Sequence, residues 1–143
     1  IIKNAKAKVI ITPHPGEAAR LLGCTVKEVQ ADRIGACRDL TELTGATVVL
    51  KGSRTVVSSN GEDFYINTTG NSGLATAGSG DVLAGIIVSL ICQRISPDLS
   101  AAMGVFIHGY TGDIATEKHS KMGMTAQKII AELPKTLSAF EKG

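Results

Sequence analysis

The stretch from Asn67 to Asp81 carries the clearest chemical signal in the chain. It reads NTTGNSGLATAGSGD, and Asp81 is the only charged residue between Phe64 and Gln93. A helix that begins near Gly80 would present unpaired N–H groups, and about half a positive charge, to an anion. The glycines allow close backbone approach, which suits a phosphate group. We therefore expect an anion-binding loop that ends at Asp81.

Asp81 has two interpretations. A carboxylate beside a phosphate is unfavourable unless it acts in the reaction, for example by accepting the proton of a hydroxyl group that attacks phosphorus. The alternative is an ordinary helix N-cap after a flexible loop. The spacing matches neither a Walker A nor a GxGxxG motif, so the common nucleotide motifs leave this choice open.

Two further polar segments follow short apolar runs that we expect to be strands. Ligands bind at the carboxyl ends of strands in open α/β sheets. The first segment could hold a nucleotide phosphate or ribose, or could be a plain turn; it comprises Lys51, Gly52, Ser53, Arg54 and Thr55. The second contains His14 between two prolines that fix the backbone. It suits a hydrogen bond to a polar substrate, or a rigid corner with a surface histidine.

The other histidines and the metal-ligating residue types suggest no further site. His108 lies in an apolar segment, and we expect it to be a core or interface residue bonded to a backbone group. His119 is expected at a helix end, where its charge is favourable. No His, Cys, Asp or Glu group has zinc-ligand spacing, and no Gly-x-Ser-x-Gly motif is present.

The elements that must position these residues alternate between strands and helices. Apolar runs predict strands at 9–11, 47–50 and 55–58, and the Asn60–Gly61 turn predicts a returning strand at 63–67. Helices are expected at 16–22, 25–43, 80–95 and 97–119, followed by two helical segments separated by Pro134. This order predicts an α/β fold in three layers, with helices on both faces of the sheet.

Composition limits the classes of protein. The 143 residues are 43% hydrophobic and 20% charged, which predicts one globular domain. Aromatics make up only 3% and the net charge is +2, so we expect no nucleic-acid partner. The longest apolar run is far shorter than the ~20 residues of a membrane span. Three cysteines form no CxxC pair, so we expect free thiols and a cytoplasmic location.

Taken together, the motifs resemble one family. They are Thr12–Glu17, Leu50–Gly52 with Thr55, Thr69–Asn71, Ala75–Gly85, His108–Gly109 and Gly112–Asp113, and they occur in that family's order. The family is the ADP/ATP-dependent NAD(P)H-hydrate dehydratases of the ribokinase-like superfamily. The resemblance implies that the enzyme phosphorylates the hydroxyl group of hydrated NADH or NADPH with ADP or ATP. Phosphate then leaves and NAD(P)H is restored, a metabolite repair reaction.

The resemblance also implies roles for individual residues. Asp81 would be the catalytic base and a substrate contact, and His14 and Asn71 would bind the substrate. Gly80 and the segment Lys51, Gly52, Ser53, Arg54 and Thr55 would bind the adenine nucleotide. Mg²⁺ would bridge the phosphates, without a cluster of protein carboxylates to hold it.

Family members are roughly twice as long. The resemblance therefore implies that residues 1–143 are the C-terminal portion of a single ribokinase-like dehydratase domain, without the family's first strands or a fused epimerase domain. It also implies a homo-oligomer, a tetramer in the family. Two alternatives stay open: a ribokinase-like kinase of a vitamin precursor, and a non-catalytic nucleotide-binding fragment that needs its N-terminal half.

Overall fold

The computed structural model describes residues 2–141 of the chain. A short 3-10 helix η1 (Ile2–Asn4) precedes the first strand, and a second one, η2 (Ser72–Leu74), lies in the glycine-rich loop. The strands are β1 (Ile10–Ile11), β2 (Thr47–Leu50), β3 (Val56–Ser58) and β4 (Tyr65–Ile66). The α-helices are α1 (Pro15–Leu22), α2 (Val26–Ala31), α3 (Arg33–Thr44), α4 (Ser79–Cys92), α5 (Pro97–His119) and α6 (Ala126–Glu141).

The four strands form one mixed sheet in the order β1-β2-β3-β4. β1 pairs with β2 in parallel, with Ile10 opposite Thr47. β2, β3 and β4 pair antiparallel, with Val49 opposite Val57. The parallel pair requires a crossover, which α1 to α3 provide. The carboxyl ends of β1 and β2 therefore lie side by side at one end of the sheet, and His14 and Lys51 follow them.

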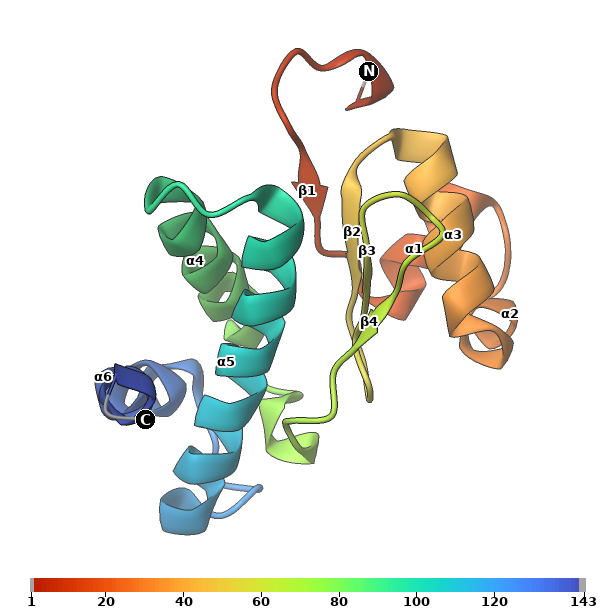
Figure 1. Cartoon of the computed structure of the whole chain (residues 1–143). Helices are drawn as coiled ribbons and strands as arrows, with labels where there is room; N and C mark the ends of the chain where they lie inside the picture. Colours follow the sequence, from red (N-terminus) through yellow and green to blue (C-terminus); the bar gives the residue numbers. More distant parts are fainter. Residues whose placement is uncertain (1, 142–143) are drawn as a thin grey trace.

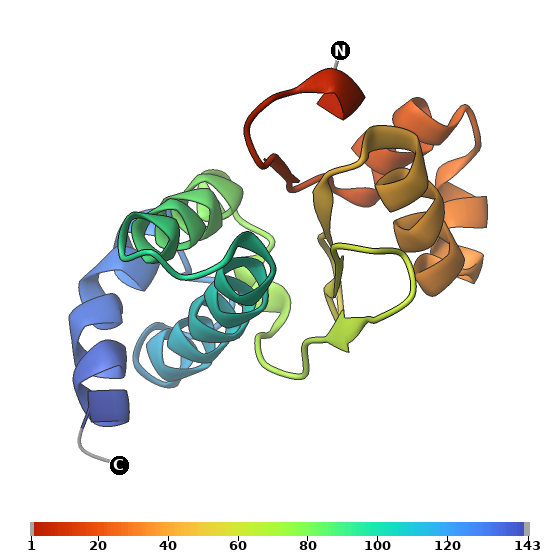
Figure 2. The same cartoon turned by 45° about the horizontal axis from the view of Figure 1, so that its top comes forward.

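Helices cover both faces of this sheet, as the sequence predicts (Figures 1 and 2). Side chains alternate between faces along a strand. Val48 and Leu50 accordingly pack against Leu40 and its neighbours on α1 to α3, whereas Val49 packs against α4 and α5. α6 packs on the outer side of α4 and α5 through Ile129 and Leu133. No helix within residues 2–141 is long and apolar enough to cross a membrane.

Two expected helix boundaries are wrong. The helix expected over 25–43 is two helices, because Asp32 ends α2 and its carboxylate accepts a hydrogen bond from the Gly35 amide at the start of α3. The two segments expected around Pro134 are one helix, α6, which continues through the proline. A proline removes one backbone hydrogen bond, but buried Ile129 and Thr136 anchor the helix on both sides of it.

Candidate functional site

The predicted site segments meet around one cavity of about 740 Å³. Its walls come from the chain after β1, the β2–β3 loop, the loop over 67–76, the start of α4 and the middle of α5. Eight of the nine predicted site residues line it: His14, Lys51, Gly52, Ser53, Arg54, Thr55, Asn71 and Gly80. Asp81 does not line this cavity.

The start of α4 forms the cationic wall of the cavity. Gly78 precedes the helix at φ +81°, and no side chain caps the first turn. The ammonium nitrogen of Lys51 lies 3.2 Å from where a Cβ atom on Gly80 would stand. The amides of Ser79 and Asp81 donate to the carbonyl groups of Thr76 and Gly78. The Gly80 amide, the helix dipole and the Lys51 ammonium group remain at the helix start, which favours an anion such as phosphate.

Arg33, at the start of α3, supports the loop that carries Lys51. Its guanidinium donates from Nη2 to the carbonyl oxygens of Leu50 (2.9 Å) and Lys51 (3.2 Å). Gly52 has φ +142°, and a side chain there would meet this guanidinium at 3.0 Å. Partial burial lowers the pKa of Arg33 from its ordinary value. Arg33 thus fixes the loop from beneath, while Lys51 faces the cavity.

His14 is held by its own helix. It is the N-cap of α1, and its Nδ1 accepts hydrogen bonds from the amides of Gly16 (3.0 Å) and Glu17 (3.2 Å). The Glu17 carboxylate accepts from the His14 amide at 2.6 Å. This bond, with a smaller contribution from the Lys51 charge, lowers the pKa of Glu17. Nδ1 is thus occupied, and Nε2, which lies 3.4 Å from Oε1 of Glu17, is the ring nitrogen that remains for a ligand.

A polar clamp ties the glycine-rich loop to α5. The Asp113 carboxylate accepts hydrogen bonds from the Gly70 amide and from the Asn71 side chain, both at 2.7 Å. The Asn71 side chain also accepts from the Gly73 amide at 2.9 Å. Gly109 allows the close approach, because a Cβ there would stand 2.3 Å from the Thr69 hydroxyl. Asn71 lines the cavity, but the hydrogen bonds of its amide position the loop.

His108 connects α5 to the start of α4. Its Nε2 lies 3.1 Å from the Ser79 hydroxyl, and both residues are buried. Ser79 thus contacts the imidazole through its side chain, and its backbone provides a contact of the kind expected from the sequence. Burial lowers the pKa of His108 to about 4, against a weaker opposing effect of the Ser79 backbone. The imidazole is consequently neutral at pH 7.

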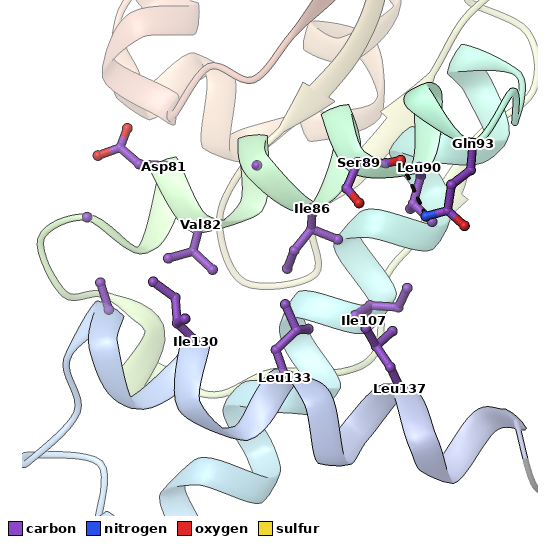
Figure 3. A pocket seen from close by; sticks show the side chains of 13 residues that line it. Asp81, Val82, Ile86, Ser89, Leu90, Gln93, Ile107, Ile130, Leu133 and Leu137 are labelled. Atoms are coloured by element: carbon purple, nitrogen blue, oxygen red, sulfur yellow. Dashed lines mark hydrogen bonds between the residues drawn. The ribbon is translucent and has the colours of Figure 1, made fainter.

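Asp81 is exposed in the first turn of α4, directly after Gly80. It borders a second space, an apolar groove of about 580 Å³ between α4 and α6. Its carboxylate points away from Val82 and Ile130, which line that groove (Figure 3). Asp81 therefore stands at the edge of the cationic wall, outside both apolar packing and the lining of the larger cavity.

Sequence reasoning missed the residues that hold the site together. Arg33, Ser79 and Asp113 act through partners that lie 17, 29 and 43 positions away in the chain, respectively. No local sequence pattern predicts pairs of residues so far apart in the chain. The available signals are the motifs that contain two of these residues: Ser79 lies within Ala75–Gly85, and Asp113 follows Gly112 within an apolar helix.

Residues 2–135 match the family model described as NAD(P)H-hydrate dehydratase. The ADP-dependent (S)-NAD(P)H-hydrate dehydratase of Neisseria meningitidis is 54% identical over 76% of this chain and 37% of its own length. The bifunctional NAD(P)H-hydrate repair enzyme Nnr of Thermofilum pendens is 43% identical over 99% of this chain and 27% of its own.

A crystal structure of the ADP/ATP-dependent NAD(P)H-hydrate dehydratase from Bacillus subtilis, co-crystallised with ATP/Mg²⁺, is similar with a TM-score of 0.88. It is 34% identical to this chain, and the match covers 93% of this chain and 48% of that one. The chain thus spans about a quarter to a half of the length of these relatives.

Proposed function

The chain belongs to the NAD(P)H-hydrate dehydratase family, and we propose that it acts in the adenine-nucleotide-dependent dehydration of hydrated NADH or NADPH. The relatives from Neisseria meningitidis and Bacillus subtilis carry this activity in their names, with ADP or ATP as the nucleotide. In this reaction the nucleotide transfers its terminal phosphoryl group to the hydroxyl group of the hydrated ring. Loss of phosphate and a proton then restores the dihydropyridine.

The observation that carries this proposal is the convergence of Lys51 on the uncapped start of α4. Phosphoryl transfer depends on positioning and charge stabilisation. The Lys51 ammonium and the Gly80 amide at the start of α4 would provide both for a terminal phosphoryl group. The rest of the β2–β3 loop, from Gly52 to Thr55, lines the same cavity and would bind the remainder of the nucleotide.

Asp81 would act as the base. Its carboxylate follows Gly80 by one residue, so a hydroxyl group in line with a phosphoryl group at the helix start can lie within its reach. It would accept the hydroxyl proton as oxygen attacks phosphorus. The ring nitrogen would then expel phosphate, which is a far better leaving group than hydroxide. His14, through Nε2, would contact the substrate, and Asn71 would order the loop beside it.

Magnesium would enter with the nucleotide. Within residues 2–141 no group of three His, Cys, Asp or Glu side chains could hold a metal ion. Mg²⁺ keeps several water ligands and commonly binds through phosphate oxygens. The chain's own contribution to phosphate charge is therefore Lys51 and the start of α4.

A turnover assay with the chain tests this proposal. Hydrated NADH or NADPH is incubated with Mg²⁺ and either ADP or ATP, and the absorbance of the restored dihydropyridine and the released phosphate are followed together. Equal yields of both are expected with at least one nucleotide. The variant Asp39→Asn, an exposed carboxylate on α3, serves as a control and should match the unaltered chain.

The same assay separates the two alternative functions. A phosphorylated product that accumulates from a vitamin precursor, without recovery of absorbance from hydrated NADH, would support the kinase. Nucleotide binding with no turnover of either substrate would contradict catalysis by this chain and support a non-catalytic nucleotide-binding role.

We also propose a cytoplasmic homo-oligomer. Phe106, Tyr110 and Phe140 form an aromatic cluster on α5 and α6, with ring centroids 5.5–5.9 Å apart, and all three are exposed. Exposed aromatic clusters are typical of protein interfaces. Light scattering after gel filtration should give a mass of more than one chain, and Phe140→Ser should lower it.

A further inference from the structure

His108 is a buried polar residue whose hydrogen-bonding capacity is only half used within the described part of the chain. Its relative exposure is 8%, and it lines the same cavity as Lys51 and Gly80. Nε2 contacts the Ser79 hydroxyl, whereas Nδ1 has no hydrogen-bond partner among residues 2–141. Within these residues, the one fully buried side-chain nitrogen or oxygen without a partner is Nε of Arg33. Nδ1 of His108 is therefore not fully buried, and the residue lines the cavity.

The hydrogen bonds of Ser79 determine which ring nitrogen carries the proton. Ser79 is also buried, and its hydroxyl has no other partner among the described residues. A buried hydroxyl should donate its proton. If Ser79 donates to Nε2, the proton of the neutral imidazole is on Nδ1. If Nε2 donates instead, the Ser79 proton has no acceptor. The first arrangement satisfies both residues and leaves an N–H donor at the cavity.

This donor belongs to the cationic wall already described. Ser79 immediately precedes Gly80, beside which the Lys51 ammonium stands. We propose that His108, held by Ser79, donates a hydrogen bond from Nδ1 to an oxygen atom of the phosphoryl group bound at the start of α4. The assignment of a phosphoryl ligand rests on the proposed function. The role is that of a neutral donor that adds directional binding without adding charge.

Two substitutions of His108 test its two ring nitrogens separately. The amide oxygen of Gln can replace Nε2 as the acceptor of the Ser79 hydroxyl, so His108→Gln keeps the Ser79 contact and loses the donor at the cavity. The amide nitrogen of Asn can replace Nδ1, so His108→Asn keeps the donor and loses the Ser79 contact. His119→Gln makes the same chemical change at the last residue of α5 and is the matched control.

Binding is measured by calorimetry with ADP and with adenosine, which lacks phosphate, and thermal unfolding of each variant is recorded alongside. His108→Gln should weaken ADP binding roughly tenfold, as expected for a lost hydrogen bond to a charged group, and leave adenosine binding unchanged. His108→Asn should lose less ADP affinity than His108→Gln, and His119→Gln should lose none. Equal losses for ADP and adenosine, or ADP binding by His108→Gln within twofold of the unaltered chain, would overturn the proposal.

Nitrogen NMR of the unaltered chain provides a test that does not depend on a variant folding. The spectrum of labelled histidine should show His108 with its proton on Nδ1, and ADP but not adenosine should shift that resonance. A proton on Nε2 would contradict the assignment. If the unaltered chain binds no ADP, the proposed function fails as well; if it binds ADP without affecting His108, the proposal for His108 alone fails.

Discussion

At the scale of single residues, some side chains at the site face the cavity, whereas others hold those side chains in position. Lys51 faces the cavity, and Arg33 holds its loop through two carbonyl oxygens. Gly80 lines the cavity, and the Ser79–His108 pair connects its turn to α5. The types of the facing residues are readable from sequence, because cations, hydroxyls and glycines after strands indicate a phosphate site.

Asp81→Asn should abolish turnover and leave ADP affinity within about twofold. The amide keeps the size of the side chain but cannot accept the hydroxyl proton, whereas the Lys51 and α4 contacts to phosphate are unchanged. Turnover and ADP calorimetry on the same preparation measure both quantities. Retained turnover would exclude Asp81 as the base.

The stability of the chain should fall between pH 6.5 and pH 5 because of His108. Burial lowers its pKa to about 4 in the folded chain, so the unfolded chain binds more protons in this interval. The cost approaches about 1.4 kcal/mol per pH unit once the unfolded histidine is mostly protonated, which gives roughly 1.6 kcal/mol over the interval. Urea unfolding at both pH values measures this loss. His108→Gln should remove most of this pH-dependent loss of stability, and His119→Gln should leave it unchanged. If His108→Gln loses as much stability as the unaltered chain, another group is responsible.

At the scale of elements, local sequence signals predict most helix and strand boundaries to within a few residues. Gly23 and Gly45 end α1 and α3 in the αL conformation, and Thr25 begins α2 through a capping box with Glu28. The break at Asp32 was missed because the apolar spacing continues through it. The continuity of α6 was missed because packing on α4 and α5 outweighs the local preference of proline.

Pro134→Ala should stabilise the chain. Pro134 is exposed in the interior of α6, so alanine removes no packing and restores a backbone donor. A gain of about 1–3 kcal/mol in the free energy of unfolding is expected, measured by urea unfolding. The neighbouring exposed variant Lys135→Ala should change it by less than about 0.5 kcal/mol. A loss of stability in Pro134→Ala would show that α6 depends on the fixed backbone angle of the proline.

The contact between α5 and the glycine-rich loop should depend on Asp113. Asp113→Ala leaves the Gly70 amide and the Asn71 side chain without this acceptor. The expected cost is about 1–3 kcal/mol in the free energy of unfolding, accompanied by weaker ADP binding because the loop lines the cavity. Glu117→Ala, exposed on the same helix, should change neither. Normal ADP affinity in Asp113→Ala would mean that the loop keeps its shape without the clamp.

At the scale of the whole molecule, the cavity lies where two layers meet. The sheet and its loops supply His14 and Lys51, and the α4–α5 layer supplies Gly80 and His108. The sequence predicts the layers through alternation of strands and helices. It does not predict how close the layers come, because that depends on pairs such as Gly109 with Thr69, which are 40 positions apart.

The double variant Lys51→Ala/Thr55→Ala should weaken ADP binding by about tenfold or more, because it removes the sheet layer's ammonium group. It should also reduce the rise in unfolding temperature that ADP causes, since a ligand stabilises the folded chain according to its affinity. Calorimetry and thermal unfolding with ADP measure the two effects. Lys27→Ala, an exposed lysine on α2, is the control. Unchanged affinity in the double variant would place the nucleotide elsewhere.

The clamp also limits how the sequence of such a chain can change in length during evolution. Successive loop residues are matched to successive turns of α5: Thr69 donates to the Phe106 carbonyl, Gly70 to Asp113, and Asn71 to Thr116. Adding or deleting one residue on either side would shift every pair at once. Natural variation and protein engineering should therefore exchange residues in this loop but keep its length.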